Sequence, residues 1–118
     1  LSNYIFASES DFGAGPVWRF DTSDPSLMAS AMTVLSALAI EAGGKPTSGG
    51  PDIGPLQKLG VPVFRLQQDG TDYFDYHHTA DDTLDKIDPK HLQQNIAAWS
   101  VVTYLAAELP SIKRSNNE

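Results

Sequence analysis

Cysteine is absent from this chain of 118 residues, and basic residues are few. The absence of cysteine excludes disulfide bonds, thiolate zinc sites, iron–sulfur clusters and cysteine nucleophiles. Eight Lys and Arg stand against fifteen Asp and Glu, which gives a formal net charge of −7. Because nucleic acids and anionic membrane surfaces require clustered Lys and Arg, this charge balance argues against both as partners.

Long apolar runs are also lacking. The longest candidate, residues 27–42, is interrupted by Ser30, Thr33 and Ser36 and falls short of the ~18 residues of a membrane span. The N-terminus carries no basic-then-apolar signal peptide and no starting Met. We therefore expect one domain or part of one, a fragment or a processed product, with any leader lying before Leu1.

Three short apolar runs predict the strands of a small sheet. Residues 4–7 read as a buried strand that ends in carboxylates, residues 17–20 as a second short strand and residues 61–66 as a third. Helical patterns separate these runs, and such alternation favours a layered α/β sheet over a helical bundle. Two or three strands are few for the helices that they would carry, which supports the interpretation as a fragment.

Aspartates that cap helices mark the predicted helix starts. Asp24 and Asp88 are each followed by proline, which suits the first helical position. The first of these helices is expected to end at Gly43-Gly44 and the second before Pro110, while Asp52 is expected to cap a short helix over residues 53–59. The last helix is expected to bury one face, formed by Leu92, Ile96, Trp99, Thr103 and Ala106.

The most unusual segment, Tyr-His-His-Thr-Ala-Asp-Asp-Thr, occupies residues 76–83, in a polar stretch before the last helix. Neutral imidazole and carboxylate are ligands of borderline cations such as zinc. A ligand histidine usually donates its second ring N–H to a carboxylate, and Asp81 and Asp82 are near enough in sequence for that role. From the residue types alone, the alternative that His77 and His78 are ordinary exposed loop residues stays open.

Two further segments have residue types suited to a site. Glu9-Ser10-Asp11 follows a predicted strand, where ligands of open α/β sheets bind, although a carboxylate there can equally cap the loop near Gly13. Glycines at residues 49–54 precede a predicted helix and can cradle an anion, although spacing alone favours a plain turn with an Asp cap. A phosphate-binding loop is excluded, and the serine-hydrolase reading is weak because no Gly-x-Ser-x-Gly element occurs.

The order of these segments resembles the C-terminal part of zinc-dependent aminopeptidases and carboxypeptidases with a two-zinc centre, of the bacterial leucyl-aminopeptidase and carboxypeptidase Q type. The resemblance is carried by Gly-Gly-Pro-Asp-Ile-Gly-Pro-Leu at 49–56, by Gly-Val-Pro at 60–62 and by the run from His77 to Pro89, together with Glu-Ser-Asp at 9–11. It implies a partial α/β/α sandwich with a mixed sheet over residues 1–110, and a frayed tail over 111–118.

The resemblance also implies roles for individual residues. It makes Asp11 and His78 ligands of two different zinc ions, with Asp82, or less favourably Asp81, orienting His78. His77 is not expected to be a ligand, because adjacent side chains in a loop point in different directions. The substrate-binding residues that it implies are Gly49, Gly50 and Asp52 in the glycine segment, with Tyr73 or Tyr76 at the oxyanion.

The remaining zinc ligands and the catalytic Glu of that family are not found in this chain, so the resemblance places them before Leu1. It thus implies a peptide substrate, an N-terminal remainder of the same domain as partner, and a chain that by itself is inactive and binds zinc weakly. A secreted or periplasmic location follows from the resemblance alone. Two alternatives are a non-catalytic interaction module and a glutaminyl cyclase-like zinc acyltransferase, and a homodimer is left open.

Overall fold

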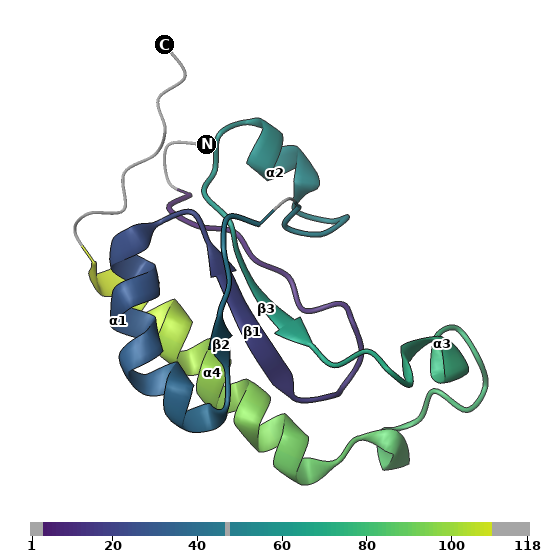
Figure 1. Cartoon of the computed structure of the whole chain (residues 1–118). Helices are drawn as coiled ribbons and strands as arrows, with labels where there is room; N and C mark the ends of the chain where they lie inside the picture. The colour runs from purple at the N-terminus through teal and green to yellow at the C-terminus, as the bar shows by residue number, and fades with distance from the viewer. Residues whose placement is uncertain (1–3, 47, 110–118) are drawn as a thin grey trace.

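The computed structural model describes residues 4–46 and 48–109 and forms a mixed three-stranded sheet (Figure 1). The central strand β1 (Val17–Thr22) pairs in parallel with the short β2 (Glu41–Ala42) and antiparallel with β3 (Phe64–Gln68), in the order β2-β1-β3. The predicted mixed α/β architecture is confirmed. The expected frayed tail lies outside the described residues.

Two helices, α1 (Pro25–Leu35) and α4 (Pro89–Glu108), pack against each other and against β1, on one face of the sheet (Figure 1). The predicted caps are confirmed, since Asp24 accepts a hydrogen bond from Leu27 N and Asp88 from Lys90 N. The core between helices and sheet consists of Val17, Phe20, Leu27, Ala31, Leu35, Ile40, Phe64, Leu66, Ala98, Val102 and Ala106. In the described part of the chain, the partial sandwich therefore has one helical layer.

The side-chain amide of Gln94 on α4 brackets the first residue of the central strand. It donates to the Val17 carbonyl at 2.7 Å and accepts from the Val17 N–H at 2.8 Å, and it also donates to the Leu38 carbonyl at 3.2 Å. One side chain thus satisfies backbone groups at the start of β1 that the strand pairing leaves free. The last helix is thereby fixed to the middle of the sheet.

The end of the first long helix differs from the prediction. The α-helix stops at Leu35 and a 3-10 turn, Ser36–Leu38 (η1), follows. Ala39 adopts a left-handed φ of 58°, which turns the chain so that Ile40 enters the core and β2 can pair with β1. The expected stop at Gly43-Gly44 is wrong because strand pairing interrupts a helix-like apolar pattern.

The expected buried strand at residues 4–7 is also wrong. Only Ala7 makes a bridge, parallel to Val63, and Tyr4 and Ile5 are about half exposed. Burial of a strand requires cover on both sides, and the described residues provide no element over the outer side of this one. The neighbouring strand begins at Phe64 rather than at 61 and runs to Gln68, leaving Pro62 before its first residue, where the missing N–H costs nothing.

The predicted face of the last helix is shifted. The buried residues of α4 are Asn95, Ala98, Val102 and Ala106, whereas Leu92 and Ile96 are 46% and 57% exposed. Trp99 is partly buried and packs on Phe64 with ring centroids 5.7 Å apart. The apolar pattern misled here because a polar residue, Asn95, occupies the buried face for its hydrogen bonds.

Three short elements lie at the two ends of β3, one before its start and two after its end (Figure 1). They are α2 (Gly54–Lys58), α3 (Tyr73–Tyr76) and the 3-10 turn η2 (Leu84–Lys86). The predicted Asp52 cap of α2 is wrong, because Ile53 occupies the cap position and no side chain caps it. Among the described residues, no helix has both the length and the apolar character needed to cross a membrane.

The sheet face opposite the helices carries a buried carboxylate, Asp21. It accepts hydrogen bonds from Arg19 Nε at 2.9 Å, from Gln67 Nε2 at 2.7 Å and from Gly44 N at 3.0 Å. A Cβ on Gly43 would lie 1.9 Å from its Oδ1, so the glycine lets the backbone cover this group. Burial by itself raises the pKa of Asp21, but the bonds from Gln67, Arg19 and Gly44 outweigh it and lower the pKa below 3.8.

Asp21→Asn is expected to lower the free energy of unfolding at pH 7 by about 1–3 kcal/mol, because an amide replaces an ionised acceptor. Since folding lowers the pKa of Asp21, its contribution is complete above pH 3.8 and is lost as the pH falls through the folded-state pKa. The stability gap between wild type and variant, measured by urea unfolding, should therefore shrink in acid. Asp75→Asn, at an exposed carboxylate, is the control. If wild type and Asp21→Asn differed in free energy of unfolding by the same amount at pH 7 and in acid, the assignment would be contradicted.

Candidate functional site

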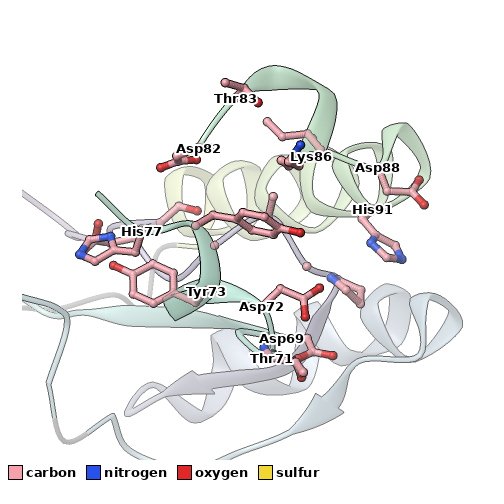
Figure 2. Close-up of a pocket in the computed structure, with 18 residues that line it drawn as sticks. Asp69, Thr71, Asp72, Tyr73, His77, Asp82, Thr83, Lys86, Asp88 and His91 are labelled. Atoms are coloured by element: carbon pink, nitrogen blue, oxygen red, sulfur yellow. Dashed lines mark hydrogen bonds between the residues drawn. The ribbon is translucent and has the colours of Figure 1, made fainter. Parts of the chain in front are cut away.

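Two neighbouring cavities open where the segment after residue 9, the turn after β3 and the start of α4 meet. The larger has a volume of about 470 Å³ and the smaller about 310 Å³. Figure 2 shows Tyr73 and His77 on one side of the larger cavity and Asp88 and His91 on the other. Asp11, Tyr73 and His77 line both cavities, and Gly49 and Gly50 line the smaller one.

A buried pair of amide side chains positions the segment that carries Asp11. Gln68, at the end of β3, donates to Asn95 Oδ1 on α4 and to the Gly13 carbonyl, both at 2.9 Å. Asn95 donates in turn to the Gly15 carbonyl at 3.0 Å and to the His91 carbonyl of its own helix at 2.8 Å. Buried amides are costly unless paired, so this network holds residues 10–16 against both the sheet and the helix.

Four stacked rings connect the segment of Asp11 to that of the histidine pair. The ring centroids of Phe12 and Tyr73 are 4.6 Å apart, those of Tyr73 and His77 4.5 Å, and those of His77 and His78 3.8 Å. Phe74 meets Tyr73 edge-on at 5.0 Å. Since Phe12 directly follows Asp11, the stack brings Asp11 and His78 to the same end of the sheet although they are distant in sequence.

His78 itself is exposed and adopts a left-handed φ of 59°. The turn around it is tight, because the Thr79 N–H and hydroxyl both donate to the Tyr76 carbonyl, at 2.9 Å and 2.6 Å. A non-glycine residue in this conformation costs free energy, and such conformations gather at functional sites. The His78 ring stacks on that of His77, so the two adjacent side chains do not point in different directions as expected, and His77, not His78, lines both cavities.

Carboxylates dominate the larger cavity. Asp11, Asp69, Asp72, Asp82 and Asp88 line it together with a single ammonium group, that of Lys86. The Thr71 hydroxyl and N–H bonds lower the pKa of Asp69, and the Lys90 N–H lowers the pKa of Asp88. Both groups therefore stay ionised well into acid, and the negative charge favours cationic ligands in this cavity.

The other sequence-predicted residues lie around the same end of the molecule. Asp82 lines the larger cavity and Asp81 is exposed beside it, and in the described structure neither carboxylate is hydrogen-bonded to an imidazole. Tyr76 lines the larger cavity, with the Lys86 Nζ 5.9 Å from its ring centroid. The side chain of Asp52 is exposed and lines neither cavity.

Sequence reasoning missed several residues that shape the site. Gln68 and Asn95 were not predicted, because the sequence does not identify the hydrogen-bond partner of a polar residue that lies within an apolar pattern. Phe12 was overlooked in a glycine-rich turn, although an aromatic residue directly after a candidate ligand is a usable signal. Glu9 does bond backbone N–H groups, as one reading of its segment allows, but those of Asp52 and Ile53 rather than those near Gly13.

Asn95→Ala is expected to lower the free energy of unfolding by about 2–3 kcal/mol, because the Gln68 amide and the Gly15 carbonyl lose buried partners. Amide exchange in residues 10–16 should also become faster. Gln93→Ala, at an exposed amide on the same helix, is the matched control for urea unfolding and hydrogen exchange. Equal stability and equal exchange in the two variants would show that the amide pair does not hold this segment.

Comparison with known proteins gives consistent relatives. Residues 19–103, which include His78, match the profile of Peptidase family M28. Carboxypeptidase Q of Bos taurus is 35% identical over 112 residues, and that of Homo sapiens 32% over 116 residues; each alignment covers 92% of this chain and 24% of the relative.

A solved structure shares the fold. It is a Peptidase M28 precursor from Shewanella amazonensis SB2B, with 46% sequence identity and a TM-score of 0.83, covering 92% of this chain and 26% of that protein. The chain thus spans about a quarter of the length of these relatives. A profile match over most of the residues, together with this structural similarity, shows that the chain belongs to Peptidase family M28.

Proposed function

We propose that this chain is the C-terminal part of the catalytic domain of a zinc-dependent exopeptidase, in which Asp11 and His78 each bind one of two zinc ions. The observation that carries the proposal is the ring stack from Phe12 through Tyr73 and His77 to His78, which connects the segment of Asp11, a residue lining both cavities, to His78, which lines neither. Membership of a peptidase family supports the reaction class.

The donor atoms of this half-site fit zinc. A carboxylate and an imidazole are among its preferred ligands, and in the described residues no hydrogen bond engages the Asp11 carboxylate or the His78 ring nitrogens. Within the same described part, no group of three or more His, Cys, Asp or Glu is arranged to hold a metal. Two donors are short of the four of a closed site, so the chain by itself is proposed to bind zinc weakly and to be inactive.

The missing ligands and the general base are proposed to come from an N-terminal remainder of the same domain. This agrees with the relatives, since the chain aligns with about a quarter of their length. The substrate in the proposal is a peptide, and the family resemblance is the basis for including a secreted or periplasmic location.

In the proposal, individual residues of this chain have distinct roles in binding zinc and the substrate. Asp11 and His78 hold zinc, which when bound supplies a Lewis acid that activates water and polarises the scissile carbonyl. Asp82, or Asp81, orients the His78 ring by accepting a hydrogen bond from the ring N–H that does not face the zinc ion. Gly49, Gly50 and Asp52 belong to the loop against which the substrate lies, and Gly49 and Gly50 share the smaller cavity with Asp11.

A tyrosine at the oxyanion completes the assignment. Tyr73 lines both cavities and is held by rings on both faces, which favours it over Tyr76, whose ring lies near Lys86. A fixed phenol donates a hydrogen bond without reorganising, as stabilisation of a developing oxyanion requires.

Asp11→Ala and His78→Ala are each expected to weaken zinc binding about tenfold or more and to abolish peptide hydrolysis in the whole protein. Zinc stoichiometry and affinity are measured by calorimetric titration, and hydrolysis with dipeptide and aminoacyl substrates. The matched controls are Asp72→Ala and His91→Ala, which remove a carboxylate and an imidazole from the larger cavity, which Asp11 also lines.

Normal zinc affinity and activity in both test variants would overturn the ligand assignment. Loss of zinc binding equally in the control variants would mean that cavity charge, not coordination, holds the ion. A wild-type protein that neither binds zinc nor hydrolyses peptides would favour the second candidate, a non-catalytic interaction module with this fold, which the incomplete ligand set of the described residues supports.

A further inference from the structure

Glu9 links the segment of Asp11 to the glycine loop. Its Oε2 accepts hydrogen bonds from two successive backbone N–H groups, from Asp52 at 2.8 Å and from Ile53 at 3.1 Å. These N–H groups lie just before α2, where none of the α2 residues caps them. A carboxylate from a distant segment therefore binds the backbone immediately before α2, where the sequence predicted a local Asp cap.

The fit between this carboxylate and the loop depends on a glycine. Gly50 has a φ of +121°, and a Cβ added to it would lie 2.0 Å from both Cδ and Oε1 of Glu9. The Cα–H bond that occupies this direction thus points at the carboxylate, as in weak Cα–H···O contacts. Oε1 is buried and has no hydrogen-bond partner among the described residues, so Gly50 closes over it.

These contacts leave Glu9 unsuited to bind a ligand directly. One oxygen already accepts two N–H groups, and the other is sealed beneath the backbone of Gly50. What the carboxylate holds is the loop, and Gly49 and Gly50 of that loop line the smaller cavity opposite Asp11, two residues after Glu9. One side chain therefore joins the Asp11 segment to this loop.

We propose that Glu9 is a positioning residue, which holds the loop of residues 49–53 against the Asp11 segment so that the loop can receive the substrate. The proposal rests on the proposed function for the role of the loop, but the anchor itself is a property of this chain. An acceptor of the right length at residue 9 is required, because the bonds to Asp52 N and Ile53 N join the loop to the Asp11 segment.

The test uses the whole protein, with four test variants and one control variant. Glu9→Ala removes the anchor, Glu9→Met keeps its bulk without an acceptor, and Glu9→Gln keeps length and one acceptor oxygen. Gly50→Ala attacks the same contact from the loop side, and Glu41→Ala, at an exposed glutamate on β2, is the matched control. Hydrogen exchange by mass spectrometry is followed in peptides covering residues 49–59, and zinc affinity, KM and kcat are measured in parallel.

The anchor predicts about tenfold faster exchange of the loop amides in Glu9→Ala, Glu9→Met and Gly50→Ala, with most of the protection kept in Glu9→Gln. KM should rise several-fold, about three- to tenfold, in the same three variants, while kcat and zinc affinity stay within about twofold of wild type. A role limited to overall stability would instead lower the melting temperature without this split between KM and kcat, and Gln would not rescue it.

Unchanged loop exchange in Glu9→Ala would overturn the proposal. So would a loss of zinc affinity in Glu9→Gln as large as that in Asp11→Ala, because Glu9 would then belong to the metal site. If the wild-type protein neither hydrolyses peptides nor binds zinc, the proposed function is wrong, and so is the substrate-binding role of the loop. The anchor is then judged by hydrogen exchange, which does not depend on activity.

Discussion

The buried amides of Gln68 and Asn95 are the constraint on which the candidate site depends. They join the end of β3 to α4 and use their remaining hydrogen bonds to hold the carbonyls of Gly13 and Gly15. A loop of glycine, alanine and proline has little side-chain burial of its own, so its conformation comes from these bonds. Because Asp11 and Phe12 directly precede that loop, its hydrogen bonds also fix their positions. The ring stack then connects Phe12 to the histidine pair.

Local signals predicted the starts of α1 and α4 and the layered α/β class correctly, whereas the mixed sheet was implied by the family resemblance. Asp24-Pro25 and Asp88-Pro89 were sufficient because a cap and a fixed proline φ act within one turn of the chain. The failures occurred where tertiary contacts decide. Residues 39–42 continue an apolar helical pattern but turn and pair with β1, and Asn95 is buried for its hydrogen bonds while Leu92 and Ile96 are exposed.

The site was predictable in part, for the same reason. Residue type and order marked the segment of Asp11, the histidine pair and the glycine loop as candidates, and the family resemblance singled out Asp11 and His78. The structure brings Asp11, His77 and the glycine loop to one cavity. The groups that hold those segments together, Glu9 to the loop and Gln68 to Asn95, are contacts between residues far apart in sequence. No spacing rule within a single sequence reveals such pairs, because the partners are brought together by the tertiary fold and not by a fixed separation along the chain.

The bracket that Gln94 forms around Val17 has a consequence for biosynthesis. These partners are separated by 77 positions, and the central strand finds both its helical cover and the pairing of its first residue in segments that the ribosome adds later. Until α4 has left the exit tunnel, the face of β1 that packs on this helix remains uncovered, a state in which nascent chains bind chaperones or aggregate. The first residue of β1 therefore makes its hydrogen bonds to Gln94 only after α4 has been synthesised.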